Sequence, residues 1–551
     1  MKTHFFKAWS YILLISLLGC ISTAHSQVSE SQFDKMIEEN YPADEPGATI
    51  LIAKDGEKVY HKAFGTANLE LEVPMKTGMV FEIGSITKQF TAVSILMLME
   101  EGKLSLEDDI TKYIEDYPTH GHTITIHHLL THTSGIKSVT SMEEWSKVWR
   151  KDYEPKELIE FFKYEPMDFA PGEKYQYNNS AYIMLGYIIE KVSGMTYPEF
   201  LEKRIFNPLG MTQSYYGSQK EIIPKRASGY QNKENEWYNA EYLSMTQPYS
   251  AGSIMSTVED LFTWHKALQN NTLVKEETIQ KAFTNYKLNN GEPIHYGYGW
   301  SLNEIDGSRT IEHGGGIFGY TTNAIYLPEE DVYVVMFTNR DDKSPGMIST
   351  KIAAEVIGKP YKDKEDRIEL DEDYMKSLTG VYEFEDGTTR YIIFEEGQLY
   401  SQRKGSRRFR IFPFEKHKFI FEGSLANYEF EPTQNGITLI FKNRRDESIG
   451  KKTDQAIPEK EEKKVDEAIL KQYTGEYELQ PNFSITITLE DKKLMARATG
   501  QDKFQIFPES DTKFFYKVVD AQIEFVANEQ GEYDTLILYQ AGQELKGHKK
   551  D

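Results

Sequence analysis

The chain has 551 residues, enough for several domains, since a typical domain has about 100 to 200 residues. Hydrophobic residues make up 39% of it and aromatic residues 13%, a composition typical of folded domains rather than of disorder. The formal net charge of −23 repels phosphate backbones and anionic lipid surfaces, which argues against nucleic acid or a membrane surface as a main partner.

The N-terminus has the three parts of a secretory signal peptide. Two lysines, Lys2 and Lys7, precede an apolar run from Tyr11 to Ile21, and small residues follow as far as Ser26. The apolar run is shorter than the roughly 20 residues that a membrane-spanning helix needs. We therefore expect residues 1–26 to be a signal peptide cleaved after Ser26, and the mature protein to be periplasmic, surface-bound or secreted.

The only cysteine, Cys20, offers an alternative fate for the N-terminus. It ends the stretch Leu17-Leu18-Gly19-Cys20, which resembles a bacterial lipoprotein cleavage box. Cleavage after Ser26 is favoured, and a lipid tether at Cys20 is the alternative. Either way, no disulfide can form within the mature chain, and no thiolate is available to hold a metal.

The first elements after the leader are two predicted strands. Residues 48–53 and 58–63 flank Asp55-Gly56, a dipeptide that favours a tight hairpin turn. From residue 85 to 101 the apolar side chains cover nearly all faces of a helix, and Gly102 follows as a plausible cap. This pattern predicts an antiparallel pair of strands followed by a buried central helix.

A second buried helix and a buried strand are expected later in the same domain. Residues 180–192 repeat the pattern of the central helix, and residues 332–337 form a β-branched run that fits a buried strand. Strands at both ends with helices between them predict one mixed α/β domain over residues 27–357.

The C-terminal third contains an internal repeat. After a charged stretch that predicts a linker at 358–374, the segment 378–384 returns as 473–479, and 409–413 returns as 504–508, both with an offset of 95 residues. Each copy consists of short alternating segments separated by turn residues, as in a barrel or sandwich. We expect two small all-β barrels at 375–445 and 468–551, joined by a linker at 446–467.

The chemistry is expected at Ser85 and Lys88. A serine hydroxyl is a weak nucleophile and needs a base within reach, and Ser and Lys three residues apart share one face of a helix. The spacing alone is weak, because it recurs elsewhere in the chain, at Ser134/Lys137, Ser401/Lys404, Ser448/Lys451 and Ser510/Lys513. Of these serines, only Ser85 opens a long apolar helix and follows a glycine. Apolar neighbours would lower the pKa of Lys88 and let it act as a base.

Several motifs in order resemble the serine β-lactamase and penicillin-binding-protein superfamily, in its class C-like branch, over about residues 30 to 357. These motifs are Gly84-Ser85-Ile-Thr-Lys88, residues 126–135, Phe169-Ala-Pro-Gly172, Tyr177-Asn178-Asn179, residues 207–211, Ala251-Gly252, Ser256-Thr257 and His313-Gly-Gly315. The resemblance implies an α/β (α+β) fold with an antiparallel sheet and a helical subdomain, followed by lipocalin-like barrels such as those of D-aminopeptidases.

The resemblance also implies a role for each motif residue. Ser85 would form an acyl-enzyme, Tyr177 would relay a proton and Asn179 would orient Lys88 and the substrate. His313 and Gly315 would form the strand beside the substrate, where glycines permit close approach. The amides of Gly316 and Ser85 would form the oxyanion hole.

The histidine at 313 is a departure from typical β-lactamases, which have lysine there and use it toward the β-lactam carboxylate. The histidine is found in D,D-peptidases and D-aminopeptidases of the same fold. We therefore expect a peptidase acting on D-residue or cell-wall-type peptides, with a carboxylesterase or β-lactamase as alternatives. A binding protein that is acylated without turnover is the alternative from another class.

Cofactor and metal chemistry are not expected. His127, His128 and His132 lack the acidic partner and spacing of a zinc motif, so we expect them to be structural. Gly252 and Ser253 are expected to shape the wall of the site. The sequence leaves the oligomeric state and the role of the barrels open.

Overall fold

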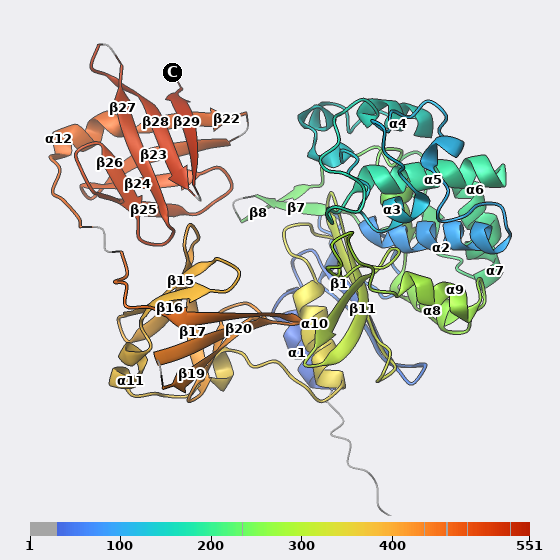
Figure 1. Cartoon of the computed structure of the whole chain (residues 1–551), viewed down its shortest axis with the longest axis horizontal. Helices are drawn as coiled ribbons and strands as arrows, with labels where there is room; N and C mark the ends of the chain where they lie inside the picture. Colours follow the sequence, from blue (N-terminus) through green and yellow to red (C-terminus); the bar gives the residue numbers. More distant parts are fainter. Residues whose placement is uncertain are drawn as a thin grey trace, which may run out of the picture.

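The computed structural model describes residues 30–233, 235–434, 436–458, 461–481, 483–528, 530–540 and 542–550. The predicted signal peptide, with Cys20 and Ser26, lies outside the described residues. Within them, no helix is both long enough and apolar enough to cross a membrane. The chain forms an N-terminal α/β domain followed by two β-barrels (Figure 1).

The α/β domain is built on a six-stranded antiparallel sheet in the order β10-β11-β12-β13-β1-β2. Its strands are β1 (Ala48–Lys54), β2 (Glu57–Phe64), β10 (Ser301–Ile305), β11 (Ser308–Ile317), β12 (Tyr320–Leu327) and β13 (Val332–Thr338). The predicted hairpin is confirmed, since β1 pairs with β2 and both Asp55 and Gly56 in the turn have positive φ. The predicted buried strand is β13.

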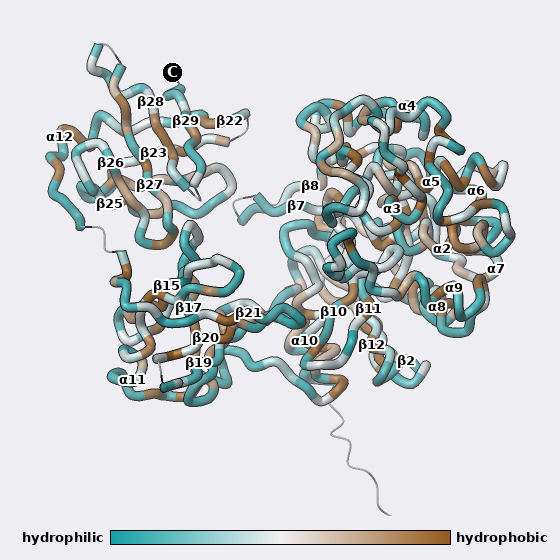
Figure 2. Tube along the Cα trace, in the orientation of Figure 1, coloured by the Kyte–Doolittle hydropathy of each residue, from teal (hydrophilic) through white to brown (hydrophobic). Residues whose placement is uncertain are grey.

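Helices cover both faces of the sheet, which explains the continuous apolar runs of its central strands. The helices α1 (Glu30–Glu38) and α10 (Gly346–Val356) pack on one face, in a core that includes Ile50 and Val334. The other face, which includes Leu51 and Val335, packs against the larger helical part of the domain. Figure 2 shows the hydrophobic stretches that run through this helical part.

Two helices form the centre of the helical part, as predicted. The helix α2 (Thr87–Glu100) is buried on nearly every face, and α5 (Asn179–Ser193) ends at Gly194 in the left-handed conformation. Around them lie α3 (Ile126–Leu130), α4 (Pro155–Phe162), α6 (Tyr197–Leu201), α7 (Asn207–Leu209), α8 (Val258–Gln269) and α9 (Glu276–Ala282).

Short strands connect the sheet to the helical part. They are β3 (Thr66–Asn68), β4 (Val73–Pro74), β5 (Phe81–Glu82), β6 (Tyr215–Tyr216), β7 (Tyr230–Lys233), β8 (Glu236–Asn239) and β9 (Ile254–Ser256). The pairing of β5 with β9 brings residue 251 and its neighbours toward the N-terminal end of α2.

The two repeats form closed barrels of the eight strands β14–β21 and β22–β29. Barrel 1 comprises β14 (Gly380–Phe384), β15 (Thr389–Glu395), β16 (Gln398–Arg403), β17 (Arg408–Glu415), β18 (Lys418–Phe421), β19 (Asn427–Thr433), β20 (Gly436–Asn443) and β21 (Asp446–Lys452). Barrel 2 comprises β22 (Gly475–Gln480), β23 (Phe483–Glu490), β24 (Lys493–Ala498), β25 (Lys503–Pro508), β26 (Lys513–Tyr516), β27 (Ala521–Ala527), β28 (Tyr533–Gln540) and β29 (Gln543–Lys549).

The expected linker at 446–467 was wrong in its first part, because β21 (Asp446–Lys452) is the strand that closes barrel 1 by pairing with β14. Its sequence looks like a linker because most of its side chains face solvent and only Gly450 is buried. Short helices precede each barrel, α11 (Glu372–Ser377) and α12 (Glu467–Leu470), and α11 begins inside the expected linker at 358–374.

Candidate active site

Ser85 lies in a short turn of 3-10 helix, Gly84–Ile86, directly before α2. Lys88 is the second residue of α2, so both side chains leave the same face at the start of the helix. Gly84 has φ of 51°, and a Cβ at this position would lie 2.9 Å from the nitrogen of Gly316. Glycine is therefore required for β11 to lie against the turn that carries Ser85.

The Lys88 amine is fully buried and contacts three oxygen atoms. Its Nζ lies 3.1 Å from Ser85 Oγ, 2.8 Å from Asn179 Oδ1 and 2.8 Å from the carbonyl oxygen of Ala251. The rings of Tyr177 and Tyr182 lie 4.8 and 5.5 Å from it. None of these neighbours is a carboxylate, so they supply no counter-charge to a positive Lys88.

The pKa of Lys88 is lowered well below its ordinary value, because burial penalises the charged ammonium form. In its neutral form the amine has two N–H donors and one lone pair. The two carbonyl-type oxygens of Asn179 and Ala251 can only accept, so they take the two donors. The lone pair is then left for the hydroxyl hydrogen of Ser85, and Lys88 can accept a proton from it.

Tyr177 stands at the mouth of the site, with 37% of its surface exposed. Burial of the phenol end raises the pKa of Tyr177 above its ordinary value, and its interaction with the Ser85 hydroxyl acts in the opposite direction. The ring packs 4.4 Å from the buried ring of His132, measured between centroids. A protonated phenol is therefore positioned beside the nucleophile.

Asn178 and Asn179 place two amides at the start of α5. The Asn178 side chain caps the helix by accepting from the Ala181 amide, while Asn179 is the first helical residue. The Asn179 Nδ2 donates to Thr140 Oγ1 at 3.0 Å, which directs its Oδ1 toward Lys88. Asn179 Oδ1 thus lies 2.8 Å from Lys88 Nζ, and its orienting role stays a prediction.

His313 lies on β11 with both ring nitrogens engaged inside the protein. Its Nδ1 is 2.6 Å from the carbonyl oxygen of Gly314, which can only accept, so Nδ1 carries the proton. Its Nε2 then accepts from the hydroxyl of Tyr296 at 3.0 Å. Burial is the main cause that lowers the pKa of His313, to about 4, so the ring is neutral near pH 7.

The end of β11 is an open edge beside Ser85. Its partner β10 pairs only as far as Glu312, so His313–Ile317 have a neighbour, β12, on one side alone. A Cβ on Gly315 would meet the carbonyl oxygen of Ile83 at 2.0 Å, whereas a Cβ on Gly316 would point into open space. Gly315 is thus needed for packing, and Gly316 faces the site.

A cavity of about 120 Å³ opens beside Ser85 between the turn, the edge of β11 and the loop before β9. Its polar lining comes from Ser85, Thr140, Asn179 and Gln247, and its apolar lining comes from Val139, Trp145, Ile183, Leu243, Pro248, Ala251, Ile317 and Phe318, with Gly84, Gly252 and Gly316 between them. The cavity therefore offers a mostly apolar wall next to the nucleophile. Gly252 lines it as predicted, whereas Ser253 is buried and donates to the carbonyl oxygen of Met245.

The predicted structural histidines have internal partners. The His127 Nδ1 lies 2.8 Å from the Tyr298 hydroxyl, and His128 caps α3 together with Thr125. His132 is fully buried, and its Nδ1 accepts from the Asn178 amide at 3.1 Å. In the described ranges, no group of three or more His, Cys, Asp or Glu side chains is arranged to hold a metal ion.

Two site components escaped the sequence analysis. Tyr296 lies in a loop with no motif around it, and only the fold brings it to His313. The Ala251 carbonyl is a backbone atom, which no side-chain pattern reveals. The other Ser-x-x-Lys pairs lack such surroundings; Lys137, for example, pairs with Asp168 at 3.0 Å.

Comparison with known proteins identifies the two parts of the chain. The family model described as Beta-lactamase matches residues 33–358, and a model described as Domain of unknown function (DUF3471) matches residues 459–549, which contain barrel 2. Penicillin-binding protein 4* of Bacillus subtilis (strain 168) is 30% identical over 409 residues, which cover 69% of this chain and 89% of that protein.

Solved structures extend the likeness to the fold. The octameric penicillin-binding protein homologue from Pyrococcus abyssi is 29% identical, with a TM-score of 0.54 over 76% of this chain and 98% of that chain. The D-amino acid amidase from Ochrobactrum anthropi SV3 is 22% identical, with a TM-score of 0.54 over 60% of this chain and 98% of that chain, and shows the same fold. The Beta-lactamase family model matches more than half of this chain. Together with the site geometry, this match shows that the chain belongs to the Beta-lactamase family and is a serine hydrolase.

Proposed function

We propose that the protein is an exported peptidase that cleaves amide bonds next to D-residues through an acyl-enzyme on Ser85. The observation that carries the proposal is the fully buried Lys88 amine, 3.1 Å from Ser85 Oγ, beside an apolar cavity. The family supplies the hydrolase class, and the site supports the finer assignment.

Acylation begins with the Ser85 hydroxyl. Its oxygen attacks the substrate carbonyl while its proton moves to the Lys88 lone pair, which the partners of Lys88 leave directed at Ser85. The resulting ammonium ion keeps hydrogen bonds to Asn179 and Ala251. Negative charge develops on the former carbonyl oxygen, and the backbone amides of Ser85 and Gly316, which line the same cavity, are the proposed donors to it.

Collapse of the tetrahedral intermediate expels the amine, which must receive a proton. The Tyr177 phenol, protonated and beside Ser85, is the proposed donor, and Lys88 restores its proton. Water then attacks the acyl-enzyme carbonyl, with the same groups acting in the reverse direction. Ser85 is released with its proton, and the free acid leaves.

The walls of the cavity indicate the substrate. Trp145, Leu243 and Phe318 offer apolar surface where the side chain of the acyl residue would lie. The open edge of β11 at His313–Ile317 can pair with an extended peptide backbone. A peptide with an apolar side chain at the cleaved residue fits both features, and the fold shared with a D-amino acid amidase supports a D-residue there.

The neutral state of His313 disfavours a β-lactam as the natural substrate. At about 4, the pKa of His313 leaves no positive charge on the ring near pH 7, and both of its nitrogens already have partners. A substrate carboxylate therefore gains no ion pair at this position. A carboxylesterase is the closest second candidate, since an ester needs no proton on its leaving group.

A panel assay of purified protein tests the proposal. We expect hydrolysis of D-phenylalanine amide and of D-residue dipeptides to exceed that of the L-forms and of a chromogenic β-lactam. A preference for short esters with no amide turnover would favour the esterase. Ser85→Ala should abolish turnover, with Ser134→Ala as the matched control, because Ser134 shares the Ser-x-x-Lys spacing but not the site.

A fluorescent serine-directed probe separates the enzyme from a binding protein that is acylated without turnover. A hydrolase should be labelled at Ser85 and should also release product from nitrophenyl esters continuously. Labelling at Ser85 with no release beyond one equivalent would support the binding protein. Both the hydrolase and the binding protein require that Ser85→Ala loses the label and that Ser134→Ala keeps it.

Export is the remaining part of the proposal and rests on residues 1–26. The mature protein should begin at Gln27 when the N-terminus of cell-derived protein is sequenced. A blocked, lipid-modified N-terminus at Cys20 would replace signal cleavage after Ser26 with lipoprotein processing. An intact Met1 would contradict both routes.

A further inference from the structure

The turn between β20 and β21 of barrel 1 contacts β11, the strand that lies beside Ser85. Asn443 pairs with Asp446, so Arg444 and Arg445 are the two residues of a tight hairpin turn. Both arginine side chains reach away from the barrel to β10 and β11 of the α/β domain. Through this turn, a repeat with no assigned role contacts the catalytic sheet.

Arg444 makes a dense set of contacts there. Its Nη1 and Nη2 each lie 2.7 Å from one carboxylate oxygen of Glu312, a two-point ion pair. Its Nη2 also donates to Thr310 Oγ1 at 3.0 Å, and its Nε donates to the carbonyl oxygen of Glu304 at 3.0 Å. The two charged side chains are only 12% and 13% exposed. We name this set of contacts, from Arg444 to Glu304, Thr310 and Glu312, the clamp.

The backbone of Arg444 is in an unfavourable conformation. Its φ is 56°, in the left-handed region where tight hairpin turns favour glycine or asparagine. Other hairpin turns of the chain also have non-glycine residues with positive φ, for example Asp491 and Lys492. The case for Arg444 therefore rests on its side-chain contacts.

Glu312 lies at a sensitive point of β11. It is the last residue of β11 that pairs with β10, and the unpaired edge begins with its neighbour His313. Because side chains alternate along a strand, Glu312 points to the face opposite His313. The clamp therefore binds β11 on the face away from His313, at Glu312, where the pairing with β10 ends.

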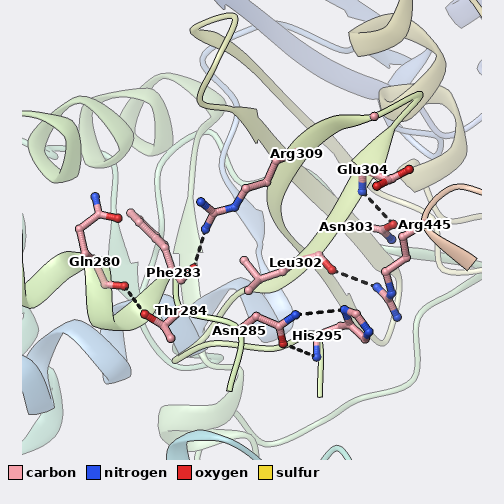
Figure 3. Close-up of a pocket in the computed structure, with 11 residues that line it drawn as sticks. Gln280, Phe283, Thr284, Asn285, His295, Leu302, Asn303, Glu304, Arg309 and Arg445 are labelled. Atoms are coloured by element: carbon pink, nitrogen blue, oxygen red, sulfur yellow. Dashed lines mark hydrogen bonds between the residues drawn. The ribbon is translucent and has the colours of Figure 1, made fainter. Parts of the chain in front are cut away.

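Arg445 adds a second attachment, to the edge strand itself. Its Nη1 donates to the carbonyl oxygen of Leu302 on β10 at 3.0 Å, and its Nε lies 3.3 Å from Asp446. Figure 3 shows this contact beside a hollow of about 520 Å³ that His295 and Arg309 also line. Both β10 and β11 are thus held by the same turn.

We propose that Arg444 is a positioning residue. Through it, barrel 1 fixes the position of β11 relative to the Ser85 turn, so that His313, Gly315 and Gly316 lie in line with Ser85. Without Arg444, the Glu312 carboxylate would lose its counter-charge in a poorly hydrated place and turn toward water. The free edge of β11 would then shift away from the Ser85 turn. Small displacements of this kind reduce the rate of the chemical step more than they reduce the stability of the fold.

The test is the rate constant of Ser85 acylation at saturating fluorescent probe, measured in the full-length chain together with the thermal unfolding midpoint. We expect Arg444→Ala to slow acylation roughly ten- to hundredfold, since small misplacements have effects of this size. Arg444→Lys, which keeps the charge but not the two-point contact, should fall between Arg444→Ala and wild type. Arg410→Ala, an exposed arginine on β17 of the same barrel, should match wild type.

A second variant keeps the test decisive if Arg444→Ala folds poorly. Glu312→Gln preserves the shape of the partner and removes its charge, so it should slow acylation in the same direction with an unchanged far-ultraviolet spectrum. Arg444→Ala and Glu312→Gln combined should be no slower than the slower single variant, because both remove the same contact.

Two results would overturn the clamp. One is acylation of Arg444→Ala and Glu312→Gln at the rate of Arg410→Ala. The other is a double variant in which the two single losses multiply, which would mean that the residues act separately. The inference rests on the proposed function, in which Ser85 is the nucleophile, and labelling of the wild type tests that part separately. If the wild type is not labelled, both proposals are wrong. If it is labelled, the variants test the clamp alone.

Discussion

At the residue scale, the chemistry of the site depends on the protonation states of Lys88 and Tyr177. Burial lowers the pKa of Lys88 and so favours the neutral amine, whose two N–H donors go to Asn179 and Ala251 and whose lone pair is left for Ser85. Tyr177 keeps its proton because its phenol end is also desolvated. In water these two side chains have nearly the same pKa, about 10, and both hold their protons near pH 7. Burial moves the two pKa values apart, so the site provides a base in Lys88 and an acid in Tyr177.

The proton on Tyr177 leads to a prediction for Tyr177→Phe. Removing the hydroxyl while keeping the ring should lower the turnover of amide substrates about 10²- to 10⁴-fold, as expected for loss of a general acid. Ester turnover should fall less, because an alkoxide leaving group needs less help. Steady-state kinetics on a matched amide and ester would check it. Tyr175→Phe is the control, since Tyr175 shares the mouth of the site and its 37% exposure.

The depressed pKa of Lys88 predicts a pH dependence of stability. The amine is neutral in the folded protein and an ammonium ion in the unfolded chain, so the unfolded state binds more protons. The free energy of unfolding should therefore rise with pH, from the depressed folded-state pKa up to about 10.5, by at most about 1.4 kcal/mol per pH unit. Urea unfolding of wild type and Lys88→Met at several pH values would show this slope as their difference. Parallel curves for the two proteins would contradict it.

At the element scale, the site depends on how closely β11 approaches the Ser85 turn. Glycines at 84 and 315 allow the strand and the turn to touch, and the open edge beyond Glu312 leaves a place for the substrate backbone. These glycines were expected from their motifs. That the pairing of β11 with β10 ends at Glu312 was not expected, because strand length and pairing register depend on residues far apart in the sequence.

Gly315→Ala should push β11 away from the turn that carries Ser85. The added methyl group would meet the carbonyl oxygen of Ile83 at 2.0 Å and Thr322 Oγ1 at 2.3 Å, so β11 must move. We expect a loss of about 1 to 3 kcal/mol of stability, typical of overpacking, together with loss of Ser85 labelling. Gly314→Ala is the matched control, since its nearest contact would be 3.4 Å. Chemical denaturation and probe labelling measure the two effects, and equal behaviour of the two variants would refute the argument.

At the scale of the whole molecule, the three folded parts are connected by small polar contacts. Arg444 and Arg445 of barrel 1 bind the α/β domain, and the two barrels are joined by main-chain bonds and one side-chain bond. The Arg408 amide donates to the carbonyl oxygen of Val518 at 2.9 Å, and the Asp520 carboxylate accepts from the Gly405 amide at 2.9 Å. Contacts of this size permit the parts to move relative to one another.

The barrel-to-barrel contact predicts an effect of Asp520→Ala. Loss of the carboxylate removes its bond to Gly405, so barrel 2 should separate from barrel 1 more often. Trypsin should then cut the lysine-rich connection between β21 and α12 several-fold faster, while nitrophenyl ester turnover stays unchanged, because the site lies in another part of the chain. Asp502→Ala, an exposed aspartate of barrel 2, is the control. Equal cleavage of both variants would show that the carboxylate does not hold the barrels together.

The sequence alone was sufficient for the buried helix behind Ser85, the hairpin of β1 and β2, and the two barrels. Local hydrophobic periodicity, turn dipeptides and an internal repeat are properties of neighbouring residues, so they can be read along the chain. It failed at β21, whose charged residues look like a linker until the barrel supplies a partner strand.

Only the tertiary structure decided the state of the site and the contact that supports it. The pKa values of Lys88 and His313 depend on burial by distant segments, and the Ala251 carbonyl and Tyr296 reach the site through the fold. The same holds for Arg444 and Glu312, which are far apart in sequence and meet only when barrel 1 docks. Motifs determine which groups are available, whereas desolvation and contact between distant residues determine what those groups can do.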